Sequence, residues 1–226
     1  MPNLLSGSVK PATAGLNGFD VNQVLTAEQA LGFKNAGNDF CIRYLPRTAV
    51  LAEKPGNLTN AEALDILGAG LPLMAVQHVA ESPWQPNTNL GAAYGNFAAS
   101  YAAQVVGLPT GVNIWCDLEM VPDSIAAADV IAYCQAWYYA VHVAGYVPGL
   151  YVGYGTQLTA DQLYNETSFQ HYWKAYNGDE VAGRGFQLLQ KTQEKLGDIF
   201  YDPNVTQVDG EGGTVLWFAV TTSEPG

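Results

Sequence analysis

The sequence holds little positive charge. Nine Lys and Arg residues stand against 21 Asp and Glu residues in a chain of 226, which gives a formal net charge of −12 at pH 7. A chain this acidic repels the phosphate backbone of nucleic acids and the head groups of anionic lipids. We therefore expect its partners to include neither nucleic acid nor an anionic membrane surface.

Cysteine and histidine are scarce as well, with three residues of each. The cysteines stand in apolar runs or on an apolar helix face, so we expect buried free thiols. They are Cys41, Cys116 and Cys134. The chain has no Cys-x-x-Cys or His-Glu-x-x-His pattern, and its histidines stand at unrelated spacings. The sequence therefore predicts no zinc site, and it implies no other metal or organic cofactor.

Long hydrophobic runs are also missing. No apolar stretch reaches the roughly 20 residues that a membrane-spanning helix needs, so we expect no membrane insertion. The first 15 residues lack a basic segment followed by an apolar one, so no secretory signal is seen in this chain. Hydrophobic residues make up 48% and charged residues only 13%, which is the balance of a compact globular chain.

What the sequence does have is a regular order of elements. From Leu16 onward, short apolar strand-like runs alternate with helical patterns, and after Tyr154 three strand-like runs follow one another with short connections. Strand and helix in alternation predict a parallel sheet with helical crossovers. We therefore predict an α/β fold, a single TIM-like (β/α)-barrel with five βα units followed by three strands. Residues 16–226 are expected to form this one domain, and residues 1–15 a loose tail.

The run NIWCDLEMV, residues 113–121, is predicted to be a strand that ends in two carboxylates. Side chains alternate along a strand, so Asp117 and Glu119 face the same way, with their carboxyl groups about 5 to 8 Å apart. Burial of two like charges raises at least one pKa unless both are paired. That is the condition for a proton donor beside an anion. The alternative is a solvent-facing strand end with two hydrated acids.

Other polar and aromatic residues fall at predicted strand ends, where barrels of this type place their active sites. Asp20 and Asp202 join the Asp117 and Glu119 pair, and Trp and Tyr residues surround them. Aromatic faces pack on sugar C–H groups while polar side chains bond to hydroxyls, so we predict a carbohydrate-binding acidic cleft. The predicted substrate-binding residues are Arg43, Tyr44, Gln77, Trp84, Tyr151, Trp173, Tyr176, Gln187 and Asn204.

Structural roles are open for several of these residues. Asp20 and Asp202 could cap loops, and Arg43 could be an ion-pair partner of Asp20 or Asp117. Trp84 could anchor its loop, and Trp115 fits a barrel core as well as a sugar platform.

Six short motifs follow one another along the chain: GFDV, IWCDLE, LYVG, HYWKAY, FQL and DPN. Their order resembles that of glycoside hydrolase family 25 lysozymes. RYLPR, followed by LTNAEALDILGAGLPLMAVQ, is more similar still to the related glycoside-hydrolase-like barrel domain of unknown function. The resemblance covers residues 16–208, and it rests on the order and spacing of the motifs.

Family 25 lysozymes cleave the β-1,4 bond between N-acetylmuramic acid and N-acetylglucosamine in peptidoglycan. By this resemblance Glu119 is the general acid, and Asp117 stabilises positive charge in an oxocarbenium or oxazolinium-like species. Asp20 and Asp202 orient substrate and hold the acid pair in its charge state. The resemblance thus implies a glycosidase that acts on an N-acetylated polysaccharide of the cell wall, outside the cell.

A second hypothesis is a catalytically silent barrel that binds glycan or serves as a structural module of a cell-envelope or phage-like assembly. The two hypotheses differ in the state of Glu119. An enzyme needs this side chain partly desolvated and unpaired, whereas a silent module could hold it locked against Arg43.

Overall fold

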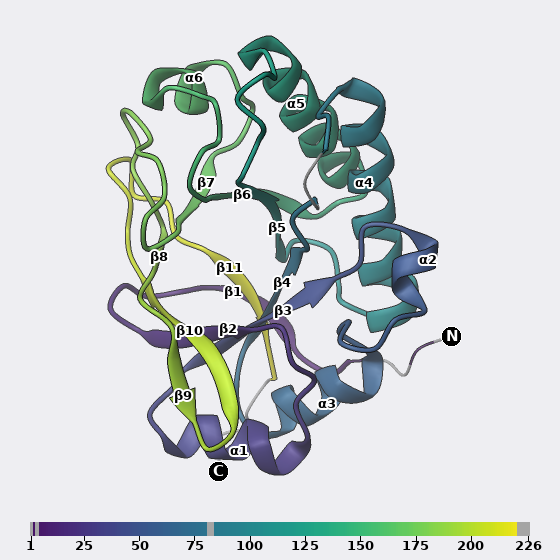
Figure 1. Ribbon diagram of the computed structural model, residues 1–226. Coiled ribbons are helices and arrows are strands. Elements are labelled where there is room, and N and C mark those ends of the chain that lie inside the picture. Colours follow the sequence, from purple (N-terminus) through teal and green to yellow (C-terminus); the bar gives the residue numbers. More distant parts are fainter. Residues whose placement is uncertain (1, 3–4, 81–83, 221–226) are drawn as a thin grey trace.

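A closed ring of eight strands forms the centre of the molecule in the computed structural model, which describes residues 2, 5–80 and 84–220 (Figure 1). The strands of the ring are β2 (Asn17–Val21), β3 (Phe40–Leu45), β4 (Leu73–Gln77), β5 (Asn113–Leu118), β6 (Val147–Val152), β7 (His171–Lys174), β8 (Leu188–Gln190) and β10 (Ile199–Thr206). Since β4 pairs with β5 and β10 pairs with both β8 and β2, the ring closes. The predicted α/β barrel is confirmed.

Helices lie between the first strands and cover the outside of the barrel (Figure 1). They are α1 (Ala27–Asn35), α2 (Ala49–Ala52), α3 (Asn60–Gly68), α4 (Thr88–Tyr101) with a π-helical turn (Ala102–Val106), α5 (Ala127–Val143) and α6 (Ala160–Asn165). Thr26 begins α1 with a capping box, because its hydroxyl accepts from the Gln29 backbone while the Gln29 side chain accepts from the Thr26 backbone. None of the helices in the described residues combines the length and the apolar character that crossing a bilayer requires.

Strand β10 runs antiparallel to both of its neighbours, although we had expected parallel-type strands throughout. Asp202 lies opposite Asp20 on β2, and Asn204 lies opposite Gln190 on β8. The connection from β8 to β10 is short and contains only β9 (Glu194–Leu196), and a short connection can join only antiparallel strands. The amino-terminal end of β10 therefore lies at the end of the barrel where the parallel strands have their carboxyl ends.

Besides β9, two further strands of the described residues lie outside the ring. The last strand, β11 (Leu216–Ala219), pairs with β4 through Phe218 and Leu73, and β1 (Ser8–Pro11) pairs along β11. The expectation of a loose tail was therefore wrong for Ser8–Pro11. The apolar strand β11 needs a partner for its second edge, and β1 supplies those backbone hydrogen bonds.

Aromatic rings fill the interior of the barrel. The ring of Trp115 packs edge-on against Trp173 at 5.7 Å between centroids, and both side chains are buried. Gly149 leaves space for Trp115, since a Cβ built at this glycine would lie 2.3 Å from the indole ring. Trp115 is thus core and presents no surface to a sugar. Cys41, Cys116 and Cys134 are free and buried, as expected.

Candidate active site

Four acids meet at the end of the barrel formed by the carboxyl ends of the parallel strands. Asp202 lies directly opposite Asp20 in the β10–β2 ladder. Asp117 interacts electrostatically with Glu119 and Asp20, and Glu119 interacts with Asp202. The structure thus brings together the four acids that the sequence singled out.

Asp20 is the most deeply buried of the four acids and is only 1% exposed. Its carboxylate accepts hydrogen bonds from the Tyr44 hydroxyl at 2.9 Å, from Gln190 Nε2 at 2.9 Å and from Asn204 Nδ2 at 2.7 Å. Burial raises the pKa of Asp20 to about 7 in spite of these hydrogen bonds, and the charge of Asp202 adds to the rise.

The amides that hold Asp20 are themselves held in one orientation. Trp173 Nε1 donates to Asn204 Oδ1 at 2.7 Å, and the Tyr151 hydroxyl donates to Gln190 Oε1 at 2.9 Å. An indole N–H can only donate, so the oxygen of Asn204 must face Trp173 and its nitrogen must face Asp20. Trp173 and Asn204 are both buried. They therefore lie beneath Asp20 and hold its partners in place. Trp173, which was predicted to bind substrate, has no exposed surface to offer to a sugar.

Asp117 is a buried carboxylic acid in an acidic environment. Burial raises the pKa of Asp117 well above its usual range, and the charges of Glu119 and Asp20 raise it further. The Val79 backbone N–H and the charge of Arg47 act in the opposite direction. Within the described residues, Oδ1 of Asp117 has no hydrogen-bond partner. This oxygen is thus a buried acceptor that the described residues leave without a donor.

Glu119 lies at the end of β5, partly open to solvent. Burial raises the pKa of Glu119, and the charge of Asp202 raises it further. The next residue, Met120, has a left-handed backbone with φ of 50°, and its N–H donates to the Tyr154 carbonyl at 2.9 Å. Such a conformation is costly for a residue with a side chain and is found mostly at functional sites. Asp117 and Glu119 together form a pair that retains a proton more readily than isolated carboxylates do.

Arg43 does not reach this site. The guanidinium is fully buried on the outer side of β3, where its Nε lies 2.6 Å from Glu62 Oε1 on α3. Adjacent strand residues face opposite ways, and Tyr44 is the one that faces into the barrel. The predictions that Arg43 binds substrate or pairs with Asp20 or Asp117 were therefore wrong. The arginine beside the site is Arg47, the second arginine of RYLPR, which the sequence reasoning missed.

Gln77 and Trp84 also have structural positions. Gln77 is buried, accepts from Trp137 Nε1 at 2.7 Å and donates to the Tyr94 carbonyl at 2.9 Å, so it ties β4 to α4 and α5. Trp84 is buried against Tyr133, with ring centroids 5.2 Å apart. Neither side chain faces the acids, and Trp84 is the loop anchor that we had considered as its alternative role.

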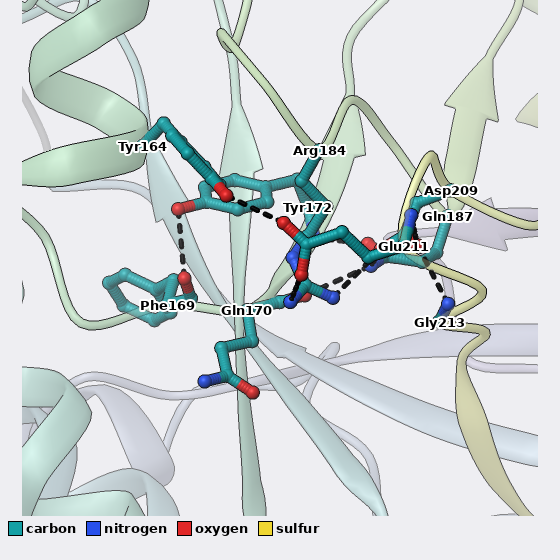
Figure 2. A network of polar contacts seen from close by, with 9 residues as sticks. All are labelled: Tyr164, Phe169, Gln170, Tyr172, Arg184, Gln187, Asp209, Glu211 and Gly213. Carbon is teal, nitrogen blue, oxygen red and sulfur yellow. Dashed lines mark hydrogen bonds and ion pairs between the residues drawn. The ribbon is translucent and has the colours of Figure 1, made fainter.

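Gln187 lies at the opposite end of the barrel. Figure 2 shows it in a network with Arg184, Asp209 and Glu211, and its Nε2 donates to the Gln170 carbonyl at 2.9 Å. Gln187 precedes β8, so it falls at the amino-terminal end of that strand. Its assignment to substrate was therefore wrong. The glutamine at the acidic end is Gln190, which the rule of carboxyl ends would have selected in GFQLLQ.

The remaining predicted residues lie near the acids. Tyr151 is largely buried, and its ring packs edge-on against Trp173 at 4.6 Å. Burial raises the pKa of Tyr151, and all four acids add to the rise, which shows that their charges converge on this hydroxyl. Tyr176 follows β7 and is 66% exposed, so its ring is accessible to a ligand.

A pocket of about 380 Å³ opens beside Asp20 and Asp202. It lies between the loop that follows β2 and the hairpin of β9 and β10, and no sequence pattern had indicated it. Its lining residues are Asp20, Val21, Asn22, Gln23, Tyr44, Gln193, Phe200, Tyr201 and Asp202. The described residues include no group of three or more His, Cys, Asp or Glu placed to hold a metal ion.

The family model of the Rv2525c-like, glycoside hydrolase-like domain matches residues 31–220, which is most of the chain. The chain belongs to this family. No curated protein matches the sequence.

Solved structures show that the fold of this Rv2525c-like domain is shared with lysozyme-type barrels. The Tat-secreted protein Rv2525c of Mycobacterium tuberculosis is 18% identical with a TM-score of 0.65, over 86% of this chain and 96% of that one. A family 25 glycosyl hydrolase from Bacillus anthracis is 11% identical with a TM-score of 0.59, over 88% and 91%. The spore cortex lytic enzyme SleM of Clostridium perfringens is 14% identical with a TM-score of 0.62, over 88% and 69%.

Proposed function

We propose that this domain is a glycoside hydrolase that cleaves β-1,4 bonds in an N-acetylated cell-wall polysaccharide, in the manner of a muramidase. The arrangement of Asp117 and Glu119 carries the proposal. Asp117 lies on β5 and Glu119 directly follows it, both carboxyls have raised pKa values, and both interact with a further acid on β2 or β10. The likeness of the fold to a family 25 glycosyl hydrolase and to a spore cortex lytic enzyme supports it.

In the proposed reaction Glu119 is the general acid. Its proton passes to the glycosidic oxygen as the bond from that oxygen to the anomeric carbon breaks, and the leaving sugar departs as an alcohol. Positive charge develops on the ring that remains, and the Asp117 carboxylate stabilises it across a short distance in a site of low polarity. A water molecule then adds to the anomeric carbon and gives up a proton, which restores Glu119.

Asp20 and Asp202 set the charge state of this pair. Asp202 raises the pKa of Glu119, after burial itself, and so keeps the donor protonated at higher pH. The charge of Asp20 raises the pKa of Asp117 as well, whereas the Val79 N–H and the charge of Arg47 lower it and so favour the carboxylate that the reaction requires. The three hydrogen bonds that Asp20 accepts hold it in place, so that its effect on Asp117 is fixed before substrate arrives.

The position of Arg43 favours the enzyme over the silent module. A silent barrel could hold Glu119 locked against this arginine, but Arg43 pairs with Glu62 on the outer side of β3. Glu119 is thus left without that partner. Because a structural neighbour is a Tat-secreted protein, we further propose that the domain acts on its polysaccharide outside the cytoplasm.

The test is an activity screen on several purified peptidoglycans and on chitin oligomers, which follows turbidity and soluble reducing ends. Wild-type protein should release reducing ends, and Glu119→Gln should slow release by about 10² to 10⁴, the usual worth of general acid catalysis. Tyr139→Ala, which removes an exposed ring from α5, is the matched control and should keep full activity. Wild-type protein that binds these glycans but releases nothing would support the silent module instead.

A further inference from the structure

The hairpin formed by β9 and the first residues of β10 projects from the barrel beside α1 (Figure 1). Leu196 pairs with Ile199, Lys195 with Phe200 and Glu194 with Tyr201. Gly197 has a left-handed φ of 59°, which suits the two-residue turn between the strands. The hairpin therefore extends β10 past the end of the ring, next to the four acids.

Alternation along β10 gives this extension a defined inner face. Asn204 and Asp202 face the site, since Asn204 donates to Asp20 and Asp202 acts on Glu119. Phe200 stands two residues further along, so it points to the same side, beyond the acids. Its ring is 59% exposed, so it is accessible to a ligand in the neighbouring pocket.

Contacts on the two faces of β10 fix the position of the hairpin and of the Phe200 ring. Tyr201, on the opposite face of β10, packs edge-on against Phe33 at 5.0 Å and Phe19 at 6.0 Å, which anchors the hairpin to α1 and the barrel. Lys195 Nζ lies 5.1 Å from the centroid of the Phe200 ring, a cation–π contact that orients the ring. The ring of Phe200 is thus exposed to solvent but held in one orientation.

The pocket beside Phe200 has the chemistry of a sugar site. Asn22, Gln23 and Gln193 supply amide groups that both donate and accept hydrogen bonds. An aromatic face with amides around it matches a pyranose, whose C–H face is apolar and whose edge carries hydroxyl or acetamido groups. At about 380 Å³ the pocket falls in the size range of small-ligand sites.

We infer that this pocket is a pyranose-binding subsite that continues the active site onto the hairpin, with Phe200 as its stacking platform. The inference rests on the proposed function, because it assigns the subsite to the same polysaccharide. It makes the hairpin a determinant of chain length: only an oligosaccharide that reaches from the acids to Phe200 gains the contact. Short oligomers bound at the acids gain nothing from it.

The test measures binding of β-1,4-linked N-acetylglucosamine oligomers of increasing length by isothermal titration calorimetry. Glu119→Gln is the parent, so that slow turnover does not disturb the titration. Adding Phe200→Ala should weaken binding of the longest oligomers by about 10-fold and leave the shortest unchanged, whereas Phe200→Trp should keep the affinity of the parent. Tyr139→Ala removes an equally exposed ring elsewhere and should change nothing at any length.

Three results would overturn the subsite: equal affinity of parent and Phe200→Ala at every length, an equal loss at every length, or no binding of any oligomer by the parent. The hydrolase proposal is judged separately, by turnover of the wild-type protein. Hydrolysis by wild type with unchanged length dependence in Phe200→Ala rejects the subsite and keeps the enzyme. A length-dependent loss of binding without hydrolysis by wild type supports the subsite and rejects the enzyme.

Discussion

Gly153 lies against the side chain of Glu119. A Cβ built on this glycine would lie 2.3 Å from Glu119 Cβ and 2.6 Å from its Oε2, closer than Cβ atoms approach other atoms in proteins. The glycine follows β6 directly, so the ends of β5 and β6 meet at Glu119. Any side chain at 153 must therefore displace Glu119.

Gly153→Ala should move Glu119 and lower kcat by about 100-fold, because a displacement of about 1 Å at a reacting group costs that much. The alkaline limb of the kcat–pH profile should move as well, since the surroundings of the acid change. Gly32→Ala on α1 is the control: a Cβ there meets nothing within 4 Å, so activity should be unchanged. An unaltered rate and pH profile in Gly153→Ala would show that Glu119 is not the group that titrates.

Replacing Asp202 should change the pH range of the reaction. Burial, and then the charge of Asp202, raise the pKa of Glu119. Asp202→Asn removes that charge, so the pKa of Glu119 should fall and the proton should be lost at lower pH. The alkaline limb of the kcat–pH profile should then move towards acid. A limb that stays in place, or moves towards alkali, would contradict the role given to Asp202.

Stability should fall as pH rises because of Asp20. The pKa of this residue rises from 3.8 to about 7 on folding, so the folded state binds its proton more tightly than the unfolded chain does. That contribution is complete below pH 3.8 and is lost as pH rises through about 7. Asp20→Asn has no titrating group at this position, so its stability should fall less than that of the wild type as pH rises.

The measurement is the thermal midpoint of both proteins between about pH 4 and 8, which spans the range in which the contribution of Asp20 is lost. His171 acts in the opposite direction at lower pH, since burial lowers its pKa from 6.5 to about 4. Both proteins contain His171, so its contribution cancels in the difference between their curves. Parallel curves for wild type and Asp20→Asn would mean that Asp20 is already charged in the folded protein.

The buried pair of Arg43 and Glu62 should matter for stability. Removing one partner leaves the other charge buried without compensation, so Arg43→Leu should lower the free energy of unfolding by about 3 to 5 kcal/mol. The double variant Arg43→Leu, Glu62→Leu should recover part of that loss. Lys34→Ala, which breaks an exposed pair with Asp39, is the control and should cost about 1 kcal/mol or less. Urea unfolding measures all three, and equal values for Arg43→Leu and Lys34→Ala would contradict the assigned burial.

The part of this site that could be predicted from the sequence is the part that follows from local rules about strands. Acids at the carboxyl ends of strands follow from the position of each apolar run, and this was enough to bring Asp20, Asp117 and Glu119 together. Asp202 joins them because β10 runs antiparallel, which that rule does not predict. The side of the strand was harder to judge. Arg43 and Tyr44 are adjacent, and only one can face the interior, but both were assigned to it. The alternation of side chains along a strand excludes one of these two residues from the interior of the barrel but does not indicate which one.

Long-range pairing could not be predicted. The pairing of β1 with β11 joins the two ends of the chain, and nothing within Ser8–Pro11 indicates its partner. The antiparallel direction of β10 did have a signal, because the connection from β8 is too short for a crossover. The position of Phe200 depends on that direction and on the contacts of Tyr201 with Phe19 and Phe33, so the pocket beside it became visible only in three dimensions.

The most direct test of the hydrolase is the chemistry of the ends that it makes. Peptidoglycan digested by wild-type protein, reduced with borohydride and analysed by mass spectrometry should contain new N-acetylmuramitol ends, because cleavage after N-acetylmuramic acid leaves that sugar reducing. Glu119→Gln should form them about 10² to 10⁴ times more slowly. Digests that contain no new N-acetylmuramitol ends at any pH between about 4 and 8, the range in which carboxylic acids of raised pKa titrate, would contradict the proposed hydrolase activity.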